Sequence, residues 1–104
     1  MIVQVNFGDV QHSDAIVSWA EERVRAQLGH LTDRMTRVEV HLRDDNSPAK
    51  SSGNDKRCLM EGRIAGRQPL AVEHTGDDLY KVIDQAAGKL SRAVRKATER
   101  SVAP

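Results

Sequence analysis

Residues 78–97 carry two stripes at helical spacing, one apolar and one basic. At about 100° per residue, one side of such a helix collects aliphatic side chains, while the opposite side collects cations. The apolar side comprises Leu79, Val82, Ile83, Ala86, Leu90, Ala93, Val94 and Ala97, and the basic side Lys81, Lys89, Arg92, Arg95 and Lys96. The pattern predicts a long amphipathic helix that docks on a core and turns a row of cations outward.

Four shorter segments alternate apolar and polar residues, as strands with one buried face do. They cover residues 3–7, 38–42, 58–64 and 70–74, and a turn at 66–69 makes the last two a hairpin. Between the first two, Ser13 is a favourable N-cap for another helix, which Gly29 ends or bends. The inner face of that helix consists of Ile16, Val17, Ala20, Val24, Leu28 and Leu31.

The order of elements is therefore strand, helix, three strands, helix, which predicts an α+β fold. Each strand has only one strongly apolar side, so a four-stranded sheet with both helices packed on one face buries the most apolar surface. We expect one domain over residues 1–104, with a flexible loop at 44–55, where polar residues, Gly and Pro follow no period. Thr75-Gly-Asp-Asp resembles a capping box that opens the final helix.

The composition excludes several classes of protein. No apolar run approaches the roughly 20 residues that a membrane-spanning helix needs, and the first residues have none of the features of a secretory signal. Cys58 is the single cysteine, so no internal disulfide can form. We therefore expect a soluble cytoplasmic protein without a membrane partner.

Charge is distributed unevenly although the net charge is only +1. Residues 1–55 hold six basic and nine acidic residues, a net of −3, whereas residues 56–104 hold ten and six, a net of +4. Local potential, rather than the total, governs the encounter with a charged partner. The basic stripe near the end of the chain thus favours contact with a polyanion, and the phosphate backbone of a nucleic acid is the commonest one.

Several short strings, in their order and spacing, resemble the ribosome hibernation-promoting factor family, also called ribosome-associated inhibitor A or ribosomal subunit interface proteins. In the first half these are Gly8 with Ser13-Asp-Ala-Ile, Glu21-Glu-Arg-Val, Asp33-Arg-Met and Val38-Glu-Val. In the second half they are Asp78-Leu-Tyr-Lys-Val-Ile-Asp and Lys89-Leu-Ser-Arg. The resemblance covers most of the chain.

The resemblance implies a double-stranded-RNA-binding-like fold that occupies the mRNA and tRNA channel of the small ribosomal subunit and suppresses translation under stress. Carried over by position, the contacts with ribosomal RNA would be Arg23 on the first helix and Lys89, Arg92 and Lys96 on the last. The basic stripe adds Lys81 and Arg95. The chain resembles a short form without the C-terminal domain by which long members pair ribosomes, and the resemblance implies no cofactor.

Catalytic and metal chemistry find little support in the sequence. His12, His30, His41 and His74 lack close ligand spacing and Cys58 has no CxxC partner, so we expect no metal site. Cys58 alternates with buried residues, where a thiol is usually inert. No glycine-rich phosphate loop of the usual spacing occurs, so we expect neither an enzyme nor a small-molecule substrate.

Two other functions stay open at this point, a protein-interaction module and a generic binder of double-stranded RNA. The basic stripe could serve solubility alone, with an exposed sheet face or edge strand binding a protein partner instead of RNA. Trp19, at the border of the first apolar arc, and Tyr80 could stack on bases, but packing against the core is favoured for both. Arg25, Arg37, Arg63 and Arg67 are weaker candidates for RNA contact, in surface pairs, on the open sheet face or at the hairpin tip.

Overall fold

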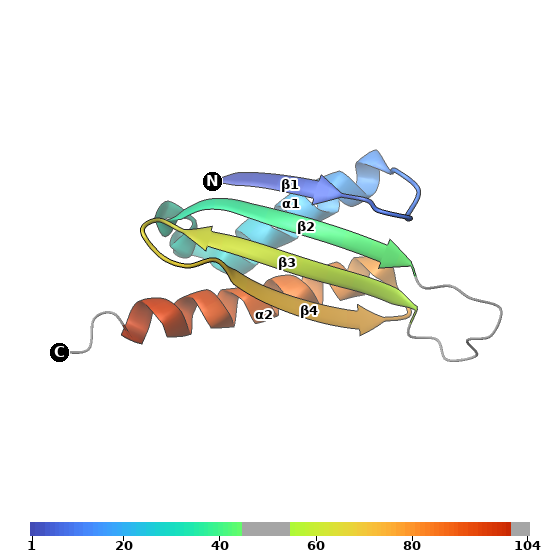
Figure 1. The fold of residues 1–104 in the computed structure, drawn as a ribbon. Helices are drawn as coiled ribbons and strands as arrows, with labels where there is room; N and C mark the ends of the chain where they lie inside the picture. The colour runs from blue at the N-terminus through green and yellow to red at the C-terminus, as the bar shows by residue number, and fades with distance from the viewer. Residues whose placement is uncertain (45–54, 101–104) are drawn as a thin grey trace.

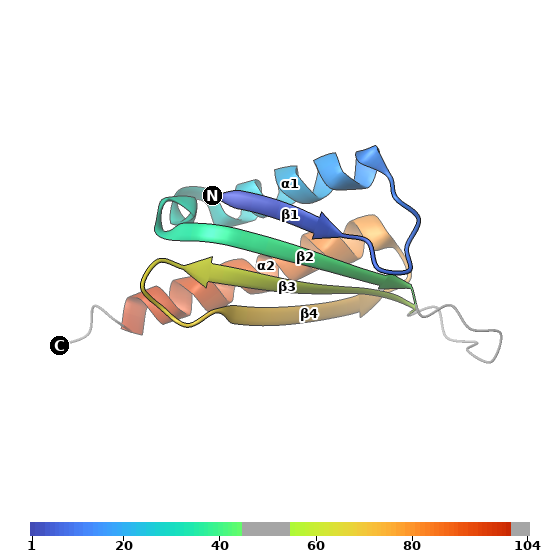
Figure 2. The same ribbon diagram turned by 45° about the horizontal axis from the view of Figure 1, so that its top comes forward.

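The computed structural model describes residues 1–44 and 55–100. Its elements are β1 (Ile2–Asn6), α1 (Asp14–Leu28), a 3-10 helix η1 (Gly29–Arg34), β2 (Met35–Asp44), β3 (Lys56–Ile64), β4 (Leu70–Gly76) and α2 (Leu79–Arg100). The four strands form one sheet in the order β1-β2-β3-β4. Both helices lie against the same face of the sheet (Figures 1 and 2), so the predicted β-α-β-β-β-α fold is confirmed.

Chain direction in the sheet follows from the connections. β1 and β2 run parallel because α1 and η1 carry the chain back between them, whereas β2, β3 and β4 pair antiparallel. Of the predicted loop at 44–55, Asp44 is the last residue of β2, and residues 45–54 lie outside the described part of the chain.

Local interactions fix the ends of α1. The Ser13 hydroxyl accepts a hydrogen bond from the backbone N–H of Ile16 at 3.3 Å, as an N-cap does. Gly29 has a φ of 56°, in the left-handed region that favours glycine, and the chain continues from there into η1. The expected N-cap is thus confirmed, and Gly29 ends α1.

The core lies between the sheet and the two helices and is almost entirely aliphatic. Its fully enclosed side chains come from β2, β3, α1 and α2 and include Val40, Met60, Val24, Ile83 and Leu90. Gly62 on β3 lets α2 come close: a Cβ there would lie 2.8 Å from Met35 Cε and 3.1 Å from Leu90 Cδ1. The backbone of α2 is consequently held tightly against the sheet, with its opposite side outward.

The start of α2 differs from the expectation. Thr75 pairs with Arg57 inside the sheet, because β4 extends to Gly76. Asp78 caps the helix instead: its carboxylate accepts from the N–H of Tyr80 at 3.0 Å, and its carbonyl from the N–H of Val82 at 2.9 Å. The prediction of a capping box that begins at Thr75 was therefore wrong. Thr75 pairs with β3 as part of β4, so it is not available to cap α2.

One basic side chain of each helix donates to a main-chain carbonyl at or next to a lateral strand of the sheet. Lys89 Nζ on α2 donates to the Glu73 carbonyl of β4 at 2.9 Å. Arg25 Nη2 on α1 donates to the Met1 carbonyl, just before β1, at 3.0 Å. Each helix thus holds one margin of the sheet as well as one half of the core. Within the described residues, no helix is both long enough and apolar enough to cross a membrane.

Candidate nucleic-acid interface

The side of α2 that faces away from the sheet carries four exposed cations, which we call the α2 cationic face. They are Lys81, Arg92, Arg95 and Lys96. Among the described residues, none gives these four side chains a hydrogen bond or ion pair. The predicted stripe therefore exists as an outward surface whose charges are not neutralised within the described molecule.

Little on α2 offsets this charge. Glu99 is exposed on the same helix but forms no ion pair with a described cation, and Asp84 is engaged elsewhere. Like charges left close together on a helix destabilise it by a few tenths of a kcal/mol per pair. An anionic partner would relieve that repulsion, and each phosphate it presents would release condensed counterions.

Lys89 belongs to the predicted stripe but occupies a different environment. Its side chain is partly buried beside β4, where Nζ donates to the Glu73 carbonyl. Burial, followed by the charge of Lys89, lowers the pKa of nearby His74 from its ordinary 6.5. The structure therefore places Lys89 at the border of the α2 cationic face, where its ammonium group is already bonded to a carbonyl of β4.

Arg23, the candidate on α1, lies in the seam between the two helices. Its Nε is 2.6 Å from Asp84 Oδ1 on α2, and the same oxygen accepts from Gln27 Nε2 at 3.2 Å. The Arg23 guanidinium holds the pKa of Asp84 below its ordinary 3.8, although burial opposes this. The amino-acid sequence alone could not predict this ion pair, because Arg23 and Asp84 are 61 positions apart and meet only when the two helices pack together.

Trp19 and Tyr80 continue the same seam. Trp19 Nε1 donates to the Tyr80 carbonyl at 2.9 Å, and the two rings meet edge to face with centroids 5.6 Å apart. The Arg23 guanidinium lies 5.7 Å from the Trp19 ring centroid, within reach of a cation–π interaction. Trp19 also packs against the hydrophobic core. Trp19 thus has the packing role favoured for it, whereas Tyr80 is 40% exposed, lies outside the core and contacts Trp19 at the surface.

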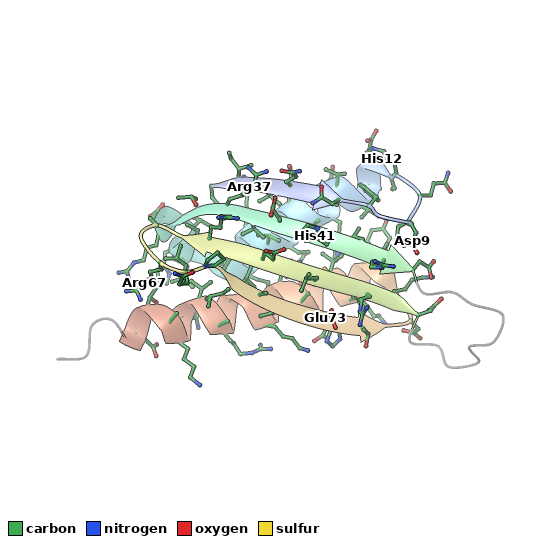
Figure 3. All side chains as sticks on the ribbon, viewed as in Figure 1. Asp9, His12, Arg37, His41, Arg67 and Glu73 are labelled. Carbon is green, nitrogen blue, oxygen red and sulfur yellow. The ribbon has the colours of Figure 1, made fainter. Side chains whose placement is uncertain are left out.

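The open face of the sheet, which the helices leave uncovered, mixes charges of both signs. Arg37 Nε lies 3.4 Å from Glu39 Oε1, and Arg57 Nε lies 3.4 Å from Glu73 Oε2. Figure 3 shows Arg37, His41 and Glu73 on this face. Arg43 and Arg63 are exposed on it and have no partner among the described residues. Arg67, in the β3–β4 turn, instead donates to the Ala97 carbonyl of α2 at 3.2 Å.

Three residues of this face come together in a way the sequence did not suggest. The ligand atoms of Glu39, His41 and Glu61 lie within 4.8 Å of one another. Among the described residues, these three form a group whose geometry could hold a cation. Glu39 and Glu61 are paired across β2 and β3, and His41 Nε2 is 3.3 Å from Glu61. Arg37 and His41 already lie against these carboxylates, so the group forms a local charge network. Strand register, not sequence spacing, creates it.

Cys58 lies in the core and has no exposed surface. Burial raises the pKa of its thiol to about 12, and the Glu73 carboxylate adds to this effect. At neutral pH the residue is therefore a protonated thiol that solvent does not reach, which is unsuited to nucleophilic chemistry.

The fold and the charged surface together define an α+β protein with a rigidly mounted cationic helix face. Residues 3–102 match the family model described as Sigma 54 modulation protein / S30EA ribosomal protein. The chain belongs to this family, which is the ribosome hibernation-promoting factor family that its sequence resembles, and the family consists of ribosome-associated modulation proteins.

Solved structures support the fold. A ribosomal subunit interface protein from Coxiella burnetii matches with a TM-score of 0.76 and 17% identity, over 95% of this chain and 99% of the other. The N-terminal domain of Thermus thermophilus Protein Y matches with a TM-score of 0.72 and 23% identity, over 93% of this chain and 99% of the other. No curated protein matches the chain significantly in sequence.

Proposed function

We propose that this protein binds the small ribosomal subunit through ribosomal RNA and suppresses translation by occupying the channel used by messenger and transfer RNA. The observation that carries the proposal is the α2 cationic face, whose four cations have no partner among the described residues. Membership in a family of ribosome-associated modulation proteins supports the same partner. The action is steric and needs neither a catalytic group nor a cofactor, and its place is the cytoplasm.

Rigidity supports this function. The apolar side of α2 is enclosed by the sheet and α1, and Gly62 allows a close fit at β3. The seam of Arg23, Asp84, Trp19 and Tyr80 fixes α1 relative to α2. Because the cations extend from a fixed helix, only their side chains lose freedom on binding, which keeps the entropic cost low.

RNA contact by the individual residues forms part of the proposal. Lys81, Arg92, Arg95 and Lys96 would meet phosphates directly. Lys89 would do so from the border of the face, while keeping or exchanging its bond to the Glu73 carbonyl. Arg23 uses Nε for Asp84, which leaves its terminal nitrogens available to RNA at the edge of the helix seam.

Sedimentation of the protein with purified small subunits over a range of salt concentrations tests the proposal. The four cations of the α2 cationic face alone predict a slope of log K against log salt of about −3, hence about 60-fold weaker binding between 50 and 200 mM salt, and contacts by Lys89 and Arg23 would make the slope steeper. A matched pair of variants locates the contacts. R92E/K96E alters the α2 cationic face, and R43E/R63E makes the same charge change with exposed, unpartnered residues of the sheet.

We expect R92E/K96E to weaken subunit binding by about 100-fold or more and R43E/R63E to have little effect. Equal loss in both variants would point to net charge alone, and normal binding by folded R92E/K96E would refute the proposed interface. Binding that is insensitive to salt would favour the alternative, a protein-interaction module. Positive charges beside the lateral strands, from Lys89 and Arg25, disfavour pairing of a partner strand with the sheet edge.

A further inference from the structure

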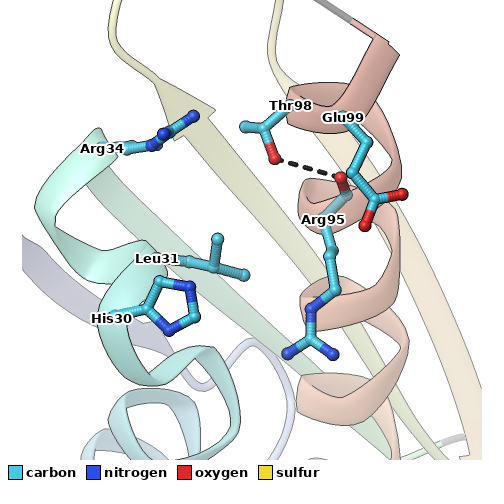
Figure 4. A pocket seen from close by; sticks show the side chains of 6 residues that line it. All are labelled: His30, Leu31, Arg34, Arg95, Thr98 and Glu99. Carbon is cyan, nitrogen blue, oxygen red and sulfur yellow. Dashed lines mark hydrogen bonds between the residues drawn. The ribbon is translucent and has the colours of Figure 1, made fainter. Parts of the chain in front are cut away.

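An open crevice lies between η1 and the last turns of α2, beside the α2 cationic face. It has a volume of about 470 Å³ and is lined by His30, Leu31, Arg34, Arg95, Thr98 and Glu99 (Figure 4). Pockets of about 300–1,000 Å³ accommodate small organic ligands. Of the six residues, Arg95 alone was a sequence candidate for the site, because the crevice forms where two segments more than 60 positions apart meet.

The floor of the crevice consists of buried side chains that are held by the core and by hydrogen bonds to the main chain. Leu31 is 4% exposed and belongs to the core, and Thr98 is 6% exposed. The Thr98 hydroxyl donates back to main-chain carbonyls of α2. The carbonyl of Arg34 accepts from the N–H of Ala65 at 2.9 Å, which ties η1 to the turn after β3. A ligand would therefore meet a preformed apolar floor.

The rim carries polar groups of two kinds. His30, Arg34 and Arg95 are exposed, and no described residue gives their side chains a hydrogen bond or ion pair. Glu99 is exposed on the same rim and has no ion pair with a described cation. A site for a simple anion would gain nothing from a carboxylate, so this lining favours a ligand that has both an anionic group and a hydrogen-bond donor.

We propose that this crevice binds a single unpaired nucleotide of RNA. The phosphate would lie against Arg34 at one end of the crevice (Figure 4), the base would rest on Leu31 and the imidazole of His30, and Glu99 would accept from an exocyclic amino group. Unpaired bases are commonly recognised in this way, by stacking and by hydrogen bonds to their edges. The site deepens the proposed function, on which it rests, by adding a base contact to phosphate contacts along α2.

Two variants and one control test the site in the full-length protein. R34Q removes a cationic phosphate donor, E99Q replaces the acceptor-only carboxylate with an amide of the same size that can both accept and donate, and R63Q neutralises an exposed arginine on the sheet. Binding of cytidine monophosphate, uridine monophosphate and inorganic phosphate is followed by backbone amide shifts of residues 30–34 and 95–99. Unfolding temperatures confirm that all variants fold.

We expect cytidine monophosphate to bind more tightly than inorganic phosphate, and R34Q to weaken nucleotide binding about 10-fold, the loss of a charge-assisted hydrogen bond. R63Q should have no effect. E99Q should erase the preference for cytidine over uridine monophosphate, because the amide can accept from the cytosine amino group or donate to the uracil O4, whereas the carboxylate can only accept. If E99Q instead strengthens both nucleotides and phosphate alike, the crevice is an anion site only, and if R34Q has no effect, the proposal is wrong.

Subunit sedimentation separates this inference from the proposed function. Wild-type protein that sediments with small subunits but shows no nucleotide-induced shifts, together with R34Q and E99Q that sediment equally well, would overturn the crevice and leave the function standing. Wild-type protein that does not sediment with subunits would overturn the function itself.

Discussion

The α2 cationic face and the open face of the sheet each carry four cations, yet they differ in how these are balanced. On α2, Lys81, Arg92, Arg95 and Lys96 lack partners among the described residues. On the sheet, Arg37 and Arg57 lie beside carboxylates, and Arg43 and Arg63 share the face with Glu39, Glu61 and Glu73. A net charge of +1 is therefore compatible with one strongly positive surface.

The geometry of the elements explains this difference. Strand register places residues from different strands side by side, so acids and bases far apart in sequence meet across the sheet. The outer side of a helix has neighbours only three and four positions away. The intervals around Arg92 and Lys96 contain few acids, and the charge on that side remains unbalanced.

Removing the charge of the α2 cationic face should give the largest effect. In K81Q/R92Q/R95Q/K96Q, the salt slope of subunit binding should become shallower by about 3, because four counterion-releasing contacts are lost. R37Q/R57Q removes two sheet cations that already have partners, and we expect a change of less than about 1. Sedimentation at four or more salt concentrations gives both slopes. Equal slopes in the two variants would show that the cations of α2 and of the sheet contribute equally to binding, which would contradict the proposed interface.

Freeing the cations of the sheet should make the two faces more alike. In E39Q/E73Q, Arg37 and Arg57 lose their carboxylate partners, and we expect a new weak affinity of this face for RNA. Binding to a short duplex RNA, measured by fluorescence anisotropy, should strengthen with a slope steeper by about 1. E21Q/E22Q, exposed on α1, makes the same charge change elsewhere, and a matching gain in that control would show that total charge, not the partners, controls binding.

The helix seam should respond to acid. The pKa of Asp84 is lower in the folded protein than its ordinary 3.8, so the pair with Arg23 stabilises the fold above that value and the stabilisation is lost as pH falls through the folded pKa. Asp84→Asn should cost under about 1 kcal/mol at neutral pH, because both side chains are partly exposed. Urea unfolding at pH 7 and pH 3 should show a smaller difference between the two pH values in the variant, and an identical acid dependence would contradict the assignment.

The hydrophobic core between α2 and the sheet should give the smallest effect, which is slow labelling of its buried cysteine. Cys58 is buried and the pKa of its thiol is raised to about 12, so the native protein should react with a thiol reagent at pH 8 only through unfolding. Labelling followed by mass spectrometry should be slow in buffer and fast in urea. Rapid labelling of the folded protein would show that the core beneath the sheet opens readily.

Much of the fold could be predicted because its signals are periodic. Alternation located all four strands, and 3.6-residue spacing located both helices and the apolar side of α2. The site was predicted only in part. The pairing of Arg23 with Asp84, the bond from Lys89 to β4, and the charge network of Glu39, His41 and Glu61 depend on contacts between distant segments. Thr75 failed for the same reason, since pairing with β3 outweighed a local motif.

The lysine and arginine that lie beside the lateral strands affect how copies of the protein meet one another. Strand edges are templates on which a second chain can extend a sheet, and positively charged side chains discourage such growth. Lys89 beside β4 and Arg25 beside the start of β1 place one positive charge near each lateral strand, which disfavours growth of the sheet by strand addition from a second copy.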